Sequence, residues 1–109
     1  MKKILLIFII ISSTNSFASS AIGNIGKLVI GRDGHQIYVE LLGVPETCGS
    51  EHPIGFNYAI STNSHPMAKE ILSTLIAAQV AGKKVTIQGG STCTIDSRME
   101  DISYIYLHP

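Results

Sequence analysis

A single segment with helical periodicity, residues 66–81, interrupts a chain whose other apolar segments alternate as strands do. Apolar residues recur there at positions 67, 68, 71, 72, 75, 76 and 80, the spacing of an amphipathic helix. Ser64 is a candidate N-cap, Pro66 suits a first turn, and Gly82 suits a left-handed C-cap. The pattern predicts one helix, and its place among the strands restricts the possible folds.

Three strand-like segments precede this helix and two follow it. They cover residues 25–30, 36–42, 56–61, 85–88 and 102–107. Asp33-Gly34 supplies the positive φ angles of a tight hairpin between the first two. The last segment is partly apolar on both faces, which predicts that it is covered on both sides.

This order is that of an OB-fold, a mainly β fold in which five strands close into a small barrel with the helix between the third and fourth strands. Closure removes the exposed strand edges of an open sheet. The helix would close the open end of the barrel with its apolar stripe, which is Met67, Ala68, Ile71, Leu72, Leu75 and Ile76. A split α+β sandwich built from the same elements is the competing fold.

The first eighteen residues have the layout of a secretory signal. Lys2 and Lys3 precede an apolar run at 4–11, and Ser16-Phe17-Ala18 offers small residues for cleavage after Ala18. The run is too short for the ~20 residues that span a hydrocarbon core, so we expect no stable membrane insertion. The prediction is a cleaved signal at 1–18, one domain at 19–109, and a periplasmic or secreted protein.

Cys48 and Cys93 are the two cysteines of the chain, and an exported protein with an even number predicts a disulfide. In the chain-entropy model a loop of this length contributes roughly 4 kcal/mol. A metal site is the rival interpretation, because His52 follows Cys48 closely. There is no second such pair and no Cys-x-x-Cys, so we expect no metal.

Composition and motifs argue against nucleic-acid binding and catalysis. Eight Lys and Arg balance eight Asp and Glu, and loss of Lys2 and Lys3 leaves the exported part acidic, which disfavours nucleic acid. No nucleophile motif is present, and the Gly-Gly-Ser-Thr run at 89–92 lacks the Lys and helix of a phosphate loop. We therefore expect neither an enzyme nor a cofactor. The acidic residues Asp96, Glu100 and Asp101 are interpreted as a solvated turn.

Part of the chain resembles a known family. The matching residues are Tyr58-Ala59-Ile60-Ser61, Pro66, Lys69-Glu70-Ile71-Leu72, Gly82 and Val85-Thr86-Ile87. With export and one disulfide, they resemble the binding subunits of pentameric A–B bacterial toxins, in the branch of subtilase cytotoxin, typhoid toxin and pertussis toxin. The resemblance implies a ring of five subunits that binds host glycans and carries a separate exported enzymatic chain. The Tyr-Ser-Asp run that grips sugar in the typhoid-type subunit is missing ahead of the first strand, so no sugar-contacting residue is carried over.

Two surfaces are candidates for such a role. In a ring, the helix face away from the apolar stripe would line the pore, and it holds Glu70, Ser73, Thr74, Ala77 and Ala81. The candidates for stacking on a ligand are Tyr38, Tyr104 and Tyr106. The plainer interpretations are a solvated helix face and tyrosines at the rim of the core. The alternative function is a monomeric exported OB-fold protein that binds another protein and no carbohydrate.

Overall fold

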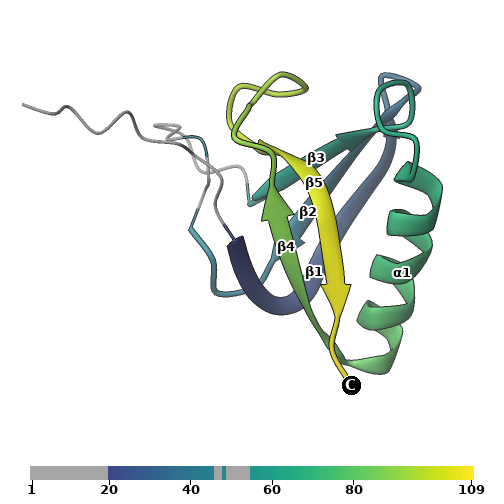
Figure 1. Ribbon diagram of the computed structural model, residues 1–109, viewed down its shortest axis with the longest axis vertical. Helices are drawn as coiled ribbons and strands as arrows, with labels where there is room; N and C mark the ends of the chain where they lie inside the picture. Colours follow the sequence, from purple (N-terminus) through teal and green to yellow (C-terminus); the bar gives the residue numbers. More distant parts are fainter. Residues whose placement is uncertain (1–19, 46–47, 49–54) are drawn as a thin grey trace, which may run out of the picture.

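The structure is a computed structural model and describes residues 20–45, 48 and 55–109 (Figure 1). Its elements are β1 (Ser20–Arg32), β2 (Gln36–Leu41), β3 (Tyr58–Ser61), α1 (Ala68–Ala81), β4 (Lys84–Gly89) and β5 (Glu100–Leu107). The strands form a closed barrel in the order β1-β2-β3-β5-β4. The predicted class, a mainly β fold with one helix between the third and fourth strands, is confirmed and is consistent with an OB-fold. The expected signal at 1–18 lies outside the described residues.

β1 is longer at both ends than the predicted 25–30 and closes the barrel by pairing with two neighbours. Its first half pairs with β4 and its second half with β2, with a register shift between Ile25 and Leu28. Gly26 lies at this shift, and the space that a side chain would take there is filled by the carboxylate of Glu40, whose Oε1 accepts the Lys27 N–H at 2.9 Å. The close approach of this side chain from the neighbouring strand β2 explains why residue 26 is a glycine.

β3 and β5 form the one parallel pair of this sheet, and it is short. The register joins Tyr58 to Glu100 and Ala59 to Asp101. Beyond Asp101, β5 continues along β4 while its other side faces α1 (Figure 1). The brief pairing therefore leaves a region between β3, β5 and α1 that side chains must fill.

The main core lies inside the barrel and includes one side of α1. Residues Ala68, Ile71, Leu75 and Ala78 of the helix are buried there against the strands. This stripe is narrower than predicted. Met67 is 52% exposed and Ile76 is 39% exposed, so their assignment to the barrel plug was wrong. Both lie at the margin of the apolar arc, and the side that the barrel covers is centred on Leu75.

The ends of α1 differ in how well the sequence predicted them. The expected N-cap at Ser64 was wrong: the helix begins at Ala68, Met67 is its N-cap residue, and no side-chain cap bond is formed. Instead Nδ1 of His65 accepts the Met67 N–H at 3.1 Å. Gly82 ends the helix in the left-handed conformation with φ 66°, as predicted.

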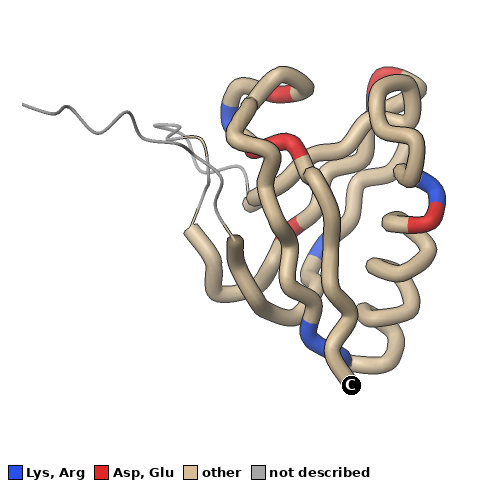
Figure 2. Tube along the Cα trace, viewed as in Figure 1, with Lys and Arg blue, Asp and Glu red and all other residues tan. Residues whose placement is uncertain are grey.

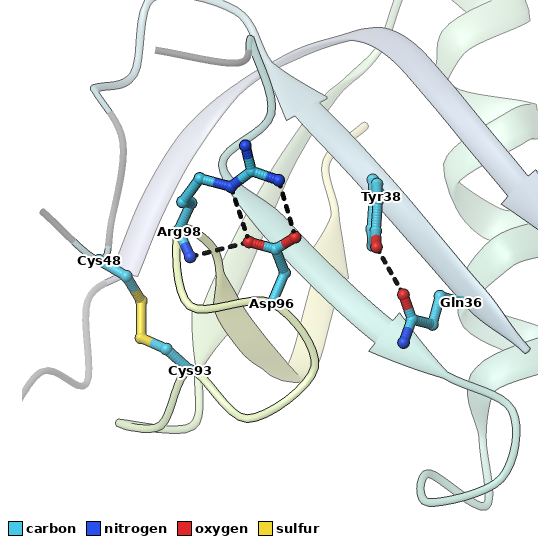
Figure 3. A network of polar contacts seen from close by, with 6 residues as sticks. All are labelled: Gln36, Tyr38, Cys48, Cys93, Asp96 and Arg98. Carbon is cyan, nitrogen blue, oxygen red and sulfur yellow. Dashed lines mark hydrogen bonds and ion pairs between the residues drawn. A yellow bond between two sulfur atoms is a disulfide. The ribbon is translucent and has the colours of Figure 1, made fainter. Parts of the chain in front are cut away.

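A second apolar cluster lies on the outer side of the barrel, where the β4–β5 loop folds over the sheet. Its buried members are Tyr38, Ala59 and Met99, flanked by Val29, Phe56 and Ile95. The predicted Cys48–Cys93 disulfide is confirmed, with 6.5 Å between the Cα atoms, and joins this loop to the segment between β2 and β3 (Figure 3). The described part of the chain contains no helix long and apolar enough to cross a bilayer.

Candidate functional site

The outer wall formed by β1, β4 and β5 presents two exposed tyrosines. The strand register places Ile22, Thr86 and Tyr106 side by side in one row and Ser20, Gln88 and Tyr104 in the next. Tyr104 is 46% exposed and Tyr106 is 54% exposed, with their rings edge to face at 5.5 Å. A hydrogen bond with Tyr106 raises the pKa of the Tyr104 hydroxyl. The expectation that this strand is covered on both sides was wrong, because no described element packs over these rings.

Tyr104 also lines a groove between α1 and β5. The groove has a volume of about 290 Å³. It is lined by His65, Met67, Glu70, Ile71, Thr74, Ser103, Tyr104 and Ile105. Glu70 and Thr74 come from the predicted pore face and Tyr104 from the predicted stacking set. The fold therefore brings together residues that the sequence assigned to separate surfaces.

A second, more polar hollow lies next to the groove, between the end of β3, the start of β5 and the β4–β5 loop. Its volume is about 360 Å³. The polar side chains in its lining are Ser61, Ser64, His65, Thr92, Thr94, Asp101 and Ser103. Five of these carry hydroxyl groups, so the hollow offers several donors and acceptors within one small volume. We call it the hydroxyl hollow.

His65 and Ser103 line both the groove and the hydroxyl hollow. The ring Nδ1 accepts the Met67 N–H, so Nε2 is the nitrogen that donates, to the Ser103 carbonyl at 2.7 Å. These two bonds tie the start of α1 to the middle of β5. His65 therefore fixes the ridge between the two hollows.

Asp101 organises the loop that bounds the hydroxyl hollow. Its carboxylate accepts the Thr92 hydroxyl at 2.6 Å, both the N–H and the hydroxyl of Thr94, and the Ile95 N–H at 3.3 Å. Because both threonine hydroxyls donate to Asp101, their remaining lone pairs are available as acceptors. The loop is thereby held with its threonine oxygens at the hollow.

The interpretation of Asp96, Glu100 and Asp101 as one solvated turn was wrong for Glu100, which is fully buried. Its Oε2 accepts the Ser91 N–H at 3.1 Å. Asp96 forms a two-pronged pair with Arg98, at 3.0 Å to Nε and 3.1 Å to Nη2 (Figure 3). The Arg98 hydrogen bonds hold the pKa of Asp96 below its ordinary value. The three carboxylates thus belong to three different environments.

Tyr38 was predicted as a stacking residue, and the structure does not place it at a ligand surface. It is 6% exposed in the outer cluster, with its ring 6.1 Å from that of Phe56 and 6.0 Å from the Arg32 guanidinium. Its hydroxyl donates to Oε1 of Gln36 (Figure 3). Burial raises the pKa of this hydroxyl. The β4–β5 loop covers the ring, so the prediction was wrong.

The rest of the predicted pore face is exposed and lies outside the groove. Ser73, Ala77 and Ala81 share the outward side of α1 with Ile76 and Val80, and Val80 is 83% exposed. The Ser73 hydroxyl donates to the Lys69 carbonyl one turn earlier, at 3.0 Å. The outward side of α1 is therefore mostly apolar and small, a composition that suits contact with another protein surface.

No group of three or more His, Cys, Asp or Glu side chains in the described residues is arranged to hold a metal ion. Comparison of the chain with models of protein families, with curated proteins and with solved structures finds no match.

Proposed function

We propose that this chain is an exported binding module that recognises glycans through the groove and the hydroxyl hollow on either side of His65. The observation that carries the proposal is the position of Tyr104, which is half exposed and lines the groove next to Ser103, a residue of both hollows. A sugar ring has an apolar face of C–H groups and a rim of hydroxyls. An aromatic ring beside clustered hydroxyl and carboxylate groups matches both.

The groove would bind the apolar face of a sugar, and the hydroxyl hollow would bind sugar hydroxyl groups. Tyr104 and Met67 offer apolar surface to the face of one sugar ring in the groove. The hydroxyl hollow offers the Thr92 and Thr94 oxygens as acceptors and its serine hydroxyls as donors or acceptors. Volumes of about 290 and 360 Å³ are small for ligand sites. They suit one sugar ring each, and hence a short oligosaccharide.

A glycan array followed by calorimetric titration tests this proposal on the exported chain. Tyr104→Ala should weaken binding of any glycan found by about tenfold, which corresponds to the ~1.4 kcal/mol typical of an aromatic contact. Leu107→Ala is the control, because it removes a similarly exposed apolar side chain from the same strand and lines neither hollow; it should leave binding unchanged. An empty array, or equal binding by Tyr104→Ala and the unaltered chain, would refute the proposal.

We also propose self-association through the outward side of α1, into the ring of five that the resemblance implies. Exposed Ile76 and Val80 beside Ala77 and Ala81 support it, because small residues let helices approach and aliphatic ones gain from burial. Native mass spectrometry should find an oligomer that Val80→Glu reduces to a monomer. Ser97→Glu, which adds the same charge to an exposed turn, should leave it intact. A chain that stays monomeric at high concentration would contradict the proposed self-association. An exported enzymatic chain would be the expected partner of such a ring.

The alternative is a monomeric exported protein that binds another protein. It is favoured by the outer wall, where Ile22 and Tyr106 are each 54% exposed in one row of the barrel surface. Exposed aromatic and aliphatic residues with few charges are typical of protein interfaces. Absence of glycan binding, together with a copurifying protein whose capture fails with Tyr106→Ala, would favour this alternative.

A further inference from the structure

The charges around the two hollows are of one sign. Glu70 lines the groove and Asp101 lines the hydroxyl hollow, whereas no Lys or Arg is among the described residues that line either one. His65 lies on the ridge between them, where Nδ1 accepts the Met67 N–H. The two carboxylates oppose an anionic ligand and attract a cationic one.

Glu70 and Asp101 differ in what their carboxylates already bind. The Asp101 carboxylate accepts hydrogen bonds from Thr92, Thr94 and Ile95, so its oxygens are already engaged in holding the β4–β5 loop. Glu70 lies in the first turn of α1, where its backbone carbonyl accepts the Thr74 hydroxyl at 2.9 Å. Its side chain makes no ion pair with any residue in the described ranges. Glu70 is thus the carboxylate that remains available to a ligand.

We infer that the groove selects a sugar that bears a free ammonium group, with the sugar ring on Tyr104 and the ammonium on Glu70. This inference rests on the proposed glycan function and names the class of sugar. An ammonium gains a charge-assisted hydrogen bond from a carboxylate and attraction from an aromatic face, here those of Glu70 and Tyr104. An N-acetyl group on the same sugar lacks the charge, and a carboxylate-bearing sugar is repelled.

Three probes separate these cases: glucosamine, N-acetylglucosamine and N-acetylneuraminic acid, each titrated calorimetrically into the exported chain at a pH where the amine is protonated. We expect glucosamine to bind at least fivefold more tightly than N-acetylglucosamine and N-acetylneuraminic acid to bind most weakly. Raising the salt concentration should reduce the glucosamine advantage. Glu70→Gln should abolish that advantage, so that glucosamine and N-acetylglucosamine bind the variant equally.

Asp33→Asn is the matched control, since it removes the same charge from an exposed turn that lines neither hollow and Asn tolerates the positive φ of 54°. It should retain the full preference for glucosamine. Thermal melting followed by circular dichroism checks that Glu70→Gln and Asp33→Asn fold alike.

The outcomes separate this inference from the function on which it rests. Equal binding of glucosamine and N-acetylglucosamine, with both weakened by Tyr104→Ala, would overturn the ammonium preference and leave glycan binding standing. Tightest binding of N-acetylneuraminic acid would also overturn it. If none of the three probes binds and the glycan array is empty, the ammonium site and the proposed function both fail.

Discussion

Gly89, at the end of β4, is the position where one added methyl group should be most damaging. An ideal Cβ there would lie 2.7 Å from Oε1 of Glu100 and closer still to Oε2. Glu100 is fully buried, so its carboxylate has no open space into which to move. The φ angle of Gly89 is not positive, and the harm of Gly89→Ala is therefore steric rather than conformational.

The magnitude follows from what the displaced carboxylate loses. Oε2 of Glu100 accepts the Ser91 N–H at 3.1 Å, and leaving a buried hydrogen-bonding group without its partner costs about 1–3 kcal/mol. Forcing a methyl group into a packed site costs about 1–3 kcal/mol more. Gly89→Ala should therefore lower the free energy of unfolding by roughly 2–6 kcal/mol, a large part of the stability of a small domain.

Gly90→Ala is the matched control, because its Cβ would lie 3.5 Å from the Asp101 carbonyl oxygen and 3.9 Å from the Ser103 Cβ, both ordinary contacts. It should change stability by less than about 1 kcal/mol. Urea unfolding followed by circular dichroism measures both variants, and Gly89→Ala combined with Glu100→Ala should lose less than the sum of the single changes. Equal stability of Gly89→Ala and Gly90→Ala would show that the Glu100 carboxylate does not exclude a side chain at residue 89.

Three further predictions concern the β4–β5 loop. Cys93→Ser should lower the free energy of unfolding by about 4 kcal/mol in the loop-entropy model, and therefore lower the melting temperature sharply in non-reducing buffer. An unchanged melting temperature would mean that the bridge to Cys48 adds no stability. Asp101→Ala should lower the free energy of unfolding by about 2 kcal/mol and speed amide hydrogen exchange at Thr94 and Ile95, whose N–H groups donate to this carboxylate. Unchanged exchange would show that Asp101 does not hold the loop. The pKa of Asp96 is lowered by Arg98, so this pair stabilises the fold above the ordinary carboxyl pKa of 3.8 and loses that contribution as the pH falls through the lower folded value. Because Arg98 is 41% exposed the effect should stay below about 1 kcal/mol, and Asp96→Asn should flatten the acid limb of the stability curve.

The element order could be predicted from the sequence because its signals are local. Three such signals depend only on neighbouring residues: the helical spacing, the Asp33-Gly34 turn and the Gly82 C-cap. All three features are present in the structure. The beginning of β1 carried no such signal, because Gly23 and Asn24 are poor strand formers. Residue 23 must be a glycine because a Cβ there would lie only 2.8 Å from the Leu42 carbonyl oxygen. That approach depends on the pairing of β1 with β2, which joins residues far apart in the chain.

Some residues of the candidate site could likewise be predicted from local sequence signals, and others could not. Tyr104 and Tyr106 were recognisable as candidates because alternation on a strand indicates which side chains share a face. Tyr38 follows the same rule, but a loop tethered by a disulfide covers it. The role of His65 could not be predicted, because its partner Ser103 is 38 residues away in the chain. Only the folded chain brings these two residues together.

The charge distribution adds a feature that composition alone conceals. Equal numbers of acidic and basic residues in the whole chain suggest no preference for the sign of a ligand. In the structure, Lys83 and Lys84 lie at the far end of α1 from Glu70 (Figure 2). Neither lysine lines the groove or the hydroxyl hollow. The local charge at the site is thus acidic although the chain as a whole is balanced.

An NMR titration of isotopically labelled residues 19–109 with sugar would locate a glycan that binds beside His65. With increasing sugar, chemical-shift changes should concentrate at His65, Glu70, Ser103 and Tyr104. Signals of Phe56 and Val44, which line a separate hollow near the β2–β3 segment, should stay in place. Shifts confined to that other hollow, or no shifts with any glycan, would show that no glycan binds beside His65.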